Sequence, residues 1–129
     1  MSGNYLLDTN IAIAFLENEA AVVRQVDEAD AVLLVSVVVG ELCFGARKSG
    51  RPGENLARVE ALIDRLPVLA CDTDVARHYG KIKNALRDRG RPIPENDIWI
   101  AAAALKHDLT LVTRDAHFSE VAGLKTQGW

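Results

Sequence analysis

The feature that most constrains the fold is a repeated switch in the hydrophobic period of the chain. Short apolar runs, each typical of a buried strand, occupy residues 5–7, 31–36, 68–71 and 110–113. After the first run, apolar residues recur at the spacing of a helix face, as Ile11, Phe15 and Leu16 do. Short strands that alternate with longer helices predict βαβ units, and therefore a parallel sheet with helices on its faces.

The same periodicity predicts where the helices lie. One helix is expected to begin near Thr9, and another is expected to have Asp72 or Thr73 as its N-cap. Further helices are expected to cover residues 20–29, 41–48, 56–66 and 98–105. Residues 49–53, Ser-Gly-Arg-Pro-Gly, are expected to break the chain as a loop. A short helix around 117–121 and a last strand near 124–125 complete the pattern. We therefore expect an α/β fold, with three α/β/α layers and a short, mostly parallel sheet of about four or five strands.

Length and charge limit the organisation and the partners. The 129 residues, 26% of them charged and 49% hydrophobic, are typical of one globular domain, expected to span residues 1–129. The formal net charge of −3 excludes a strongly basic nucleic-acid-binding coat. Contact with a nucleic acid would therefore need a local basic patch or bound cations.

Cysteine usage and hydropathy predict a cytoplasmic protein. Cys43 and Cys71 both lie in apolar surroundings, which predicts reduced, buried thiols rather than a disulfide framework. The beginning of the sequence lacks the basic and apolar regions of a signal peptide. No apolar run approaches the ~18 residues that a membrane-spanning helix needs.

Four acidic residues occupy positions that favour a metal site. Asp8, Glu41 and Asp115 each follow a predicted strand, and Asp97 begins an apolar helix. Because parallel strands end at one edge of a sheet, these acids are expected to meet there. Two carboxylates ~4 Å apart would repel by about 4 kcal/mol at an effective dielectric of 20, unless a cation lies between them. Oxygen ligands suit Mg²⁺ or Mn²⁺, which can polarise a phosphodiester and orient an attacking water.

Each acid also has an ordinary structural interpretation. Asp8 could cap the helix that follows it, a role worth about 1 kcal/mol. Glu41 could be a solvated helix residue, Asp97 could favour a helix N-terminus through the dipole, and Asp115 could cap a turn. His117 lies close to Asp115 in sequence and could approach the site, but a structural role is the expectation for it. The metal interpretation leads only because all four acids occur together.

The sequence around these acids resembles a known family. Leu-Leu-Asp-Thr-Asn (6–10), Glu41 after a strand, Asn-Asp-Ile-Trp-Ile-Ala-Ala (96–102) and Thr-Arg-Asp-Ala-His-Phe (113–118) occur in this order. Together they resemble the PIN-domain ribonucleases, most closely the VapC toxins of toxin–antitoxin pairs. Each motif alone is weak, but the ordered set spans nearly the whole chain, from Leu6 to Phe118.

The resemblance implies an activity and its partners. It implies an endoribonuclease that uses Mg²⁺, for which Mn²⁺ can substitute. The enzyme would cut structured RNA such as tRNA or rRNA, leave 5′-phosphate and 3′-hydroxyl ends, and halt translation. A small VapB-type antitoxin would inhibit it by covering the acidic pocket with its tail, and the chain would form a homodimer. The apolar helical faces 11–16 and 22–26 make such a dimer interface plausible.

The resemblance also carries over to individual residues. Asp8, Glu41, Asp97 and Asp115 match the family's catalytic acids, with Asp8 and Asp97 as direct metal ligands. Glu41 and Asp115 would bind the metal directly, act through water or help to activate the nucleophile. Asn10 and Thr113 match polar residues that line the pocket behind the ligands.

Basic residues suggest where RNA could bind. They crowd the segment 77–91, which holds a single acid, Asp88. The basic residues of this segment are Arg77, Lys81, Lys83, Arg87, Arg89 and Arg91. A solvated helix face is the ordinary interpretation, whereas in a nuclease of negative net charge the segment is a candidate phosphate track. A smaller candidate for the phosphate-binding surface consists of Arg47, Lys48 and Arg51. Arg114 is expected to point toward substrate or antitoxin.

Two rival functions remain. A phosphatase of the haloacid dehalogenase type also places an Asp at the end of its first strand, but it needs a second Asp where this chain has Asn10. A PIN-like module could instead dock RNA or a protein without cutting. The intact set of four acids argues against such a module.

Overall fold

A parallel sheet of five strands, in the order β3-β2-β1-β4-β5, forms the centre of the molecule. The computed structural model describes residues 3–129. The strands are β1 (Asn4–Leu7), β2 (Ala31–Val35), β3 (Val68–Leu69), β4 (Thr110–Val112) and β5 (Thr126–Gln127). Every adjacent pair is parallel, as the alternating pattern predicts.

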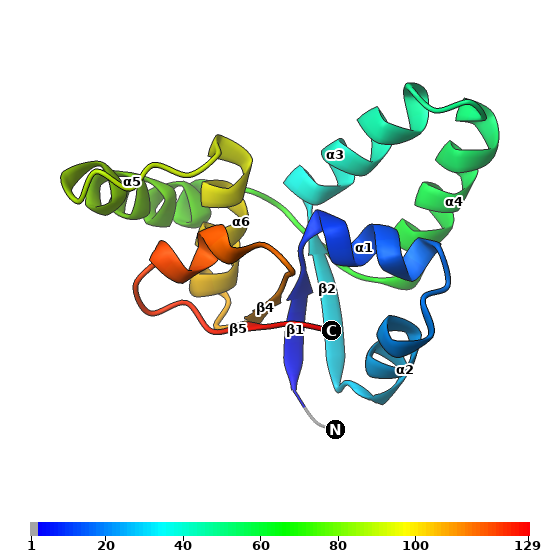
Figure 1. Cartoon of the computed structure of the whole chain (residues 1–129), viewed down its shortest axis with the longest axis horizontal. Helices are drawn as coiled ribbons and strands as arrows, with labels where there is room; N and C mark the ends of the chain where they lie inside the picture. The colour runs from blue at the N-terminus through cyan, green and yellow to red at the C-terminus, as the bar shows by residue number, and fades with distance from the viewer. Residues whose placement is uncertain (1–2) are drawn as a thin grey trace.

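Helices cover the sheet on both sides. They are α1 (Thr9–Leu16), α2 (Ala20–Glu28), α3 (Ser36–Arg47), α4 (Pro52–Arg65), α5 (Thr73–Asp88) and α6 (Glu95–Lys106), followed by the 3₁₀ helix η1 (Ala116–Glu120). Helices α1 to α4 lie to one side of β1 and β2, and α5 and α6 lie to the other (Figure 1). The predicted three-layer α/β fold is confirmed.

Burial on both faces explains the composition of the strands. Leu6 and Leu7 of β1 and Leu111 and Val112 of β4 are fully buried. A strand covered on both sides needs a continuous apolar run rather than an alternating one. In α6, residues 101–104 are four consecutive buried alanines, whose small side chains allow this helix to pack closely in the interior.

Several element boundaries differ from the sequence prediction, three of them with consequences for the fold; helix α6, for example, begins at Glu95 rather than at Ile98, and strand β3 ends at Leu69 rather than at Cys71. Helix α3 begins at Ser36 rather than at Glu41, because Val38 and Leu42 share a buried helix face despite the β-branched run around them. Helix α4 begins at Pro52, inside the expected loop, because proline is pre-organised for a first helical turn. The last strand lies at 126–127 rather than 124–125.

The position of β1 determines where a site can form. From β1 the chain moves outward to β2 and β3, and it then returns to β4 on the other side of β1. The crossover helices therefore separate at the carboxyl ends of β1 and β4. In open α/β sheets, ligands bind at such a switch point.

Two other sequence predictions concern the cysteines and the membrane. Cys43 and Cys71 are free, but they are half-buried rather than fully buried as expected, because each lies at the margin of the core. Within residues 3–129, every helix is too short or too polar to cross a bilayer.

Candidate active site

Asp8 lies at the centre of the candidate site. It follows β1, and its backbone N–H continues the sheet by donating to the carbonyl of Val112 at 2.9 Å. Its side chain caps α1, with Oδ1 accepting from the N–H of Thr9 at 2.8 Å. The capping interpretation is therefore correct, and Asp8 also faces the other acids. It is only 4% exposed, which makes its ionised form costly without counter-charge.

Two polar residues hold the second oxygen of Asp8. The hydroxyl of Thr113 donates to Asp8 Oδ2 at 2.7 Å, and Asn10 Nδ2 donates to the same oxygen at 3.4 Å. Asn10 Oδ1 in turn accepts from the N–H of Arg114 at 3.4 Å. The structure thus brings Asn10 and Thr113 beside Asp8, where they fix the direction of its carboxylate.

Glu41 reaches the same edge from α3. Its Oε1 accepts a hydrogen bond from the hydroxyl of Thr9 at 2.8 Å. Because α3 begins earlier than predicted, Glu41 lies in the second helical turn and is half-buried. Thr9, which directly follows Asp8, therefore links Glu41 to the site.

Asp97 and Asp115 come from the C-terminal half of the chain. Asp97 lies in the first turn of α6, and Asp115 caps η1 by accepting from the N–H of His117 at 3.0 Å. The imidazole of His117 lies between them, with Nδ1 3.4 Å from Asp97 Oδ2 and 3.1 Å from Asp115 Oδ1. Sequence reasoning favoured a structural role for His117 over an approach to the site, yet its side chain is directed at both acids.

A second group of contacts fixes the start of α6. Glu95 accepts hydrogen bonds from the hydroxyl of Tyr79 and the ammonium of Lys83, both on α5. The rings of Tyr79 and Trp99 stack with their centroids 4.2 Å apart. These contacts attach the first turn of α6, and with it Asp97, to α5.

The acids perturb one another's ionisation. Burial raises the pKa of the Asp8 carboxyl above its ordinary value, against hydrogen bonds from Thr113 and Thr9, and the charges of Glu41 and Asp115 raise it further. Burial also raises the pKa of Asp97, and the charge of Asp8 adds to the effect, while a hydrogen bond with His117 opposes it. Both shifts follow from negative charges gathered where water is partly excluded.

The donor set fits a divalent cation. Carboxylates converge from β1, α3, α6 and the start of η1, and ligand atoms of Asp97, Asp115 and His117 lie within 4.8 Å of one another. A bound cation would supply the counter-charge that Asp8 and Asp97 lack. Oxygen-rich sites of this kind suit Mg²⁺ and Mn²⁺.

Most of the candidate RNA-binding cations make internal ion pairs. Arg77 pairs with Asp74, Lys83 with Glu95, Arg87 with Asp88, and Arg89 with Glu120. Arg114 pairs with Glu19 and donates to the carbonyl of Trp129. Lys81 and Arg91 make no ion pair within residues 3–129, which leaves them as the cations of this segment most available to a phosphate.

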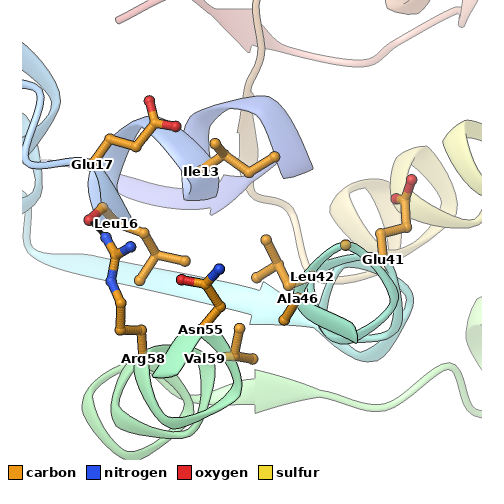
Figure 2. A pocket seen from close by; sticks show the side chains of 10 residues that line it. Ile13, Leu16, Glu17, Glu41, Leu42, Ala46, Asn55, Arg58 and Val59 are labelled. Carbon is orange, nitrogen blue, oxygen red and sulfur yellow. Dashed lines mark hydrogen bonds between the residues drawn. The ribbon is translucent and has the colours of Figure 1, made fainter. Parts of the chain in front are cut away.

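An apolar groove adjoins the acids. It lies between α1, α3 and α4, has a volume of about 280 Å³ and includes Glu41 in its lining. Figure 2 shows Ile13 and Leu16 of α1 facing Leu42 and Ala46 of α3, with Val59 of α4 below them. Ile13 is 43% exposed, whereas Ile11, Phe15, Val22 and Val26 of the expected dimer faces are buried in the chain's own core.

Known proteins share this fold and sequence. The PIN domain family matches residues 5–124. The tRNA(fMet)-specific endonuclease VapC of Shigella flexneri and the ribonuclease VapC2 of Haemophilus influenzae are each 38% identical over 128 residues, which cover 97% of both chains compared. A chain in the crystal structure of DNA-bound VapBC from Salmonella typhimurium is similar with a TM-score of 0.90 and 34% identity, over 98% of each chain.

These matches cover the chain almost from end to end, and all three relatives carry the same VapC or VapBC name. The chain therefore belongs to the PIN-domain family, and within that family to the VapC ribonucleases.

Proposed function

We propose that the chain is the toxin of a type II toxin–antitoxin pair, a Mg²⁺-dependent endoribonuclease that also accepts Mn²⁺. It cuts structured RNA in the cytoplasm and inhibits translation until a VapB-type antitoxin neutralises it. The observation that carries the proposal is the convergence of Asp8, Glu41, Asp97 and Asp115 at one edge of the sheet. Membership of the PIN-domain family argues against the phosphatase alternative.

The chain's own residues hold and orient the reacting groups. Asp8 and Asp97 would bind the cation directly, and the hydrogen bonds from Thr113 and Asn10 fix the direction of the Asp8 carboxylate. Glu41 and Asp115 either add ligands or accept the proton of the attacking water. A cation held there would polarise the phosphodiester and stabilise the leaving oxygen. Cleavage then leaves 5′-phosphate and 3′-hydroxyl ends.

Transfer RNA is the first substrate to test. The Shigella relative is a tRNA(fMet)-specific endonuclease, and 38% identity over nearly the whole chain supports a related substrate. Ribosomal RNA is the second candidate. Both are structured RNAs that position a single-stranded loop for recognition.

End-mapped cleavage of total cellular RNA tests the proposal. The purified chain, freed of antitoxin, is incubated with Mg²⁺, Mn²⁺ or excess EDTA beside Asp97→Asn. Asp108→Asn is the matched control, because Asp108 is exposed and its positive φ of 52° also suits asparagine. We expect a few discrete cuts that need metal and Asp97 but not Asp108. Cutting in EDTA would contradict metal dependence, and RNA binding without any cutting would favour the non-catalytic module.

The apolar groove supports the antitoxin part of the proposal. Solved relatives include toxin–antitoxin complexes, and the groove shares Glu41 with the acid cluster. An apolar antitoxin segment that filled the groove would therefore reach the acids. We expect Ile13→Asp to weaken antitoxin binding and to leave RNA cleavage intact. Ala61→Asp, exposed on α4, is the control, and equal antitoxin binding by both variants would contradict this placement.

A homodimer is also part of the proposal. It rests on the family resemblance, since the α1 and α2 faces first expected at the interface are mostly buried within the chain. Light scattering at several concentrations measures the mass in solution. A 14.0 kDa particle throughout would contradict the dimer.

A further inference from the structure

His117 occupies a position that the four acids alone do not explain. Its Nδ1 lies 3.1 Å from Asp115 Oδ1 and 3.4 Å from Asp97 Oδ2. The three residues come from two elements, the first turn of α6 and the start of η1. One imidazole nitrogen therefore faces carboxylates from two different elements at the same time.

The backbone around His117 is held in place. Its N–H donates to Asp115 Oδ1 at 3.0 Å, which closes the first turn of η1. The next residue, Phe118, is 1% exposed and anchors η1 in the core. The His117 side chain itself is 51% exposed, so its ring borders the open side of the cluster. The main chain at His117 is therefore fixed, and its ring is accessible to an ion that enters from solvent.

The spacing is suited to shared coordination. Adjacent ligands of an octahedral ion with bonds of about 2.1 Å lie roughly 3 Å apart. The two distances from Nδ1, 3.1 and 3.4 Å, are close to this spacing. A neutral imidazole can offer Nδ1 to an ion, and carboxylate oxygens complete the set.

We propose that His117 is a nitrogen ligand of the divalent-metal site, acting together with Asp97 and Asp115. The proposal rests on the proposed function, because it assigns a further ligand to the same site. Carboxylate oxygens suit both Mg²⁺ and Mn²⁺, whereas an imidazole nitrogen binds a transition-metal ion such as Mn²⁺ more readily than it binds Mg²⁺. His117 therefore shifts the metal preference of this site from Mg²⁺ toward Mn²⁺. If His117 were only a cation paired with the acids, its removal would instead strengthen metal binding.

Electron paramagnetic resonance of the Mn²⁺-loaded full chain tests this assignment without any activity assay. The spin-echo modulation of Mn²⁺ reports coupling to a ligand nitrogen, and labelling histidine with ¹⁵N identifies its source. The variant is His117→Gln. The chain has three histidines, so His107→Gln and His78→Gln are matched controls away from the acids.

We expect histidine nitrogen coupling in the wild type and in both controls, and its loss in His117→Gln. We also expect His117→Gln to lower Mn²⁺ affinity by about ten-fold or more, with a smaller loss for Mg²⁺. Mn²⁺ binding without nitrogen coupling, or unchanged affinity in His117→Gln, would overturn the assignment and leave the nuclease proposal standing. A wild-type chain that cuts RNA but binds neither ion would overturn both.

Discussion

The hydroxyl of Thr113 donates to Asp8 Oδ2 at 2.7 Å, although 105 positions separate the two residues in the sequence. The same hydroxyl oxygen accepts from the N–H of Asp115 at 3.0 Å. Within residues 3–129, Asp8 and Thr113 are the only residues with charged or aliphatic polar side chains that are buried. One threonine thus joins the end of β1 to the loop that carries another acid.

Thr113→Val should weaken metal binding. It removes the hydrogen bond to Asp8 and leaves the carboxylate free to rotate away from the ion, so we expect a loss of Mg²⁺ affinity of about 10–100-fold. Calorimetric titration measures the affinity. Thr113→Ser keeps the hydroxyl and should restore most of the binding, whereas Thr110→Val, earlier on β4, should have little effect. Equal affinities for Thr113→Val and Thr113→Ser would refute the role.

The metal-free protein should lose stability as pH rises. The folded chain raises the pKa values of Asp8 and Asp97 above their ordinary value of 3.8, so it binds these protons more tightly than the unfolded chain does. The contribution of these two carboxyls to the free energy of unfolding is therefore fully present below pH 3.8. It is lost as the pH rises through their raised pKa values.

Urea denaturation in EDTA across a pH series measures this effect. The double variant Asp8→Asn, Asp97→Asn removes both titrating groups. We expect the stability of the wild type relative to the variant to fall with rising pH, and Mg²⁺ to restore it near neutrality. If the difference in the free energy of unfolding between the two proteins did not change with pH, ionisation of these carboxyls would not destabilise the fold.

Two isoleucines of α1 provide a matched test of the packing. Ile11 is fully buried, and Ile13 is 43% exposed beside the groove. Ile11→Ala should lower the free energy of unfolding by about 2–5 kcal/mol, because it leaves a cavity in the core. Ile13→Ala should cost roughly 1 kcal/mol or less, because little apolar surface returns to water. Urea unfolding measures both, and similar losses would contradict the described orientation of α1.

Lys81 and Arg91 should contribute to RNA affinity more than their paired neighbours. The double variant Lys81→Ala, Arg91→Ala should weaken binding to all RNA sequences and reduce the slope of log affinity against log salt by roughly 1–2. Lys125→Ala is the control, because Lys125 is 3.0 Å from Asp108 and lies outside the segment. Fluorescence anisotropy with an uncleaved RNA, at several salt concentrations, measures the slope. An unchanged slope would show that the phosphate-binding surface lies elsewhere on the chain.

The sequence predicted the sheet well because buried parallel strands require continuous apolar runs, such as residues 5–7 and 110–113. It misplaced the start of α3 because Val37, Val38 and Val39 favour a strand locally. Packing overrides that preference, since Val38 and Leu42 must share the buried side of a helix. The two-residue strand β5 is too short to show a period.

The candidate acids could be proposed from the sequence because strand ends are visible in it. Their hydrogen-bond partners were harder to derive from the residues, since Thr9 and Thr113 act on acids 32 and 105 positions away, and only the family resemblance pointed to Thr113. The geometry of His117 was missed because its distance from Asp97 depends on how α6 packs beside η1. Only its nearness to Asp115 was visible, and that signal alone also fits a local cap.

The topology of the sheet has a consequence for protein synthesis. Asp8 comes from the first strand, whereas Thr113, Asp115 and His117 follow the fourth, beside which β1 lies in the folded sheet. A ribosome must therefore translate beyond β4 before these groups can meet. A nascent or truncated chain that stops before β4 carries only part of the acid cluster, so the site can assemble only after the ribosome has passed β4 and the loop that follows it.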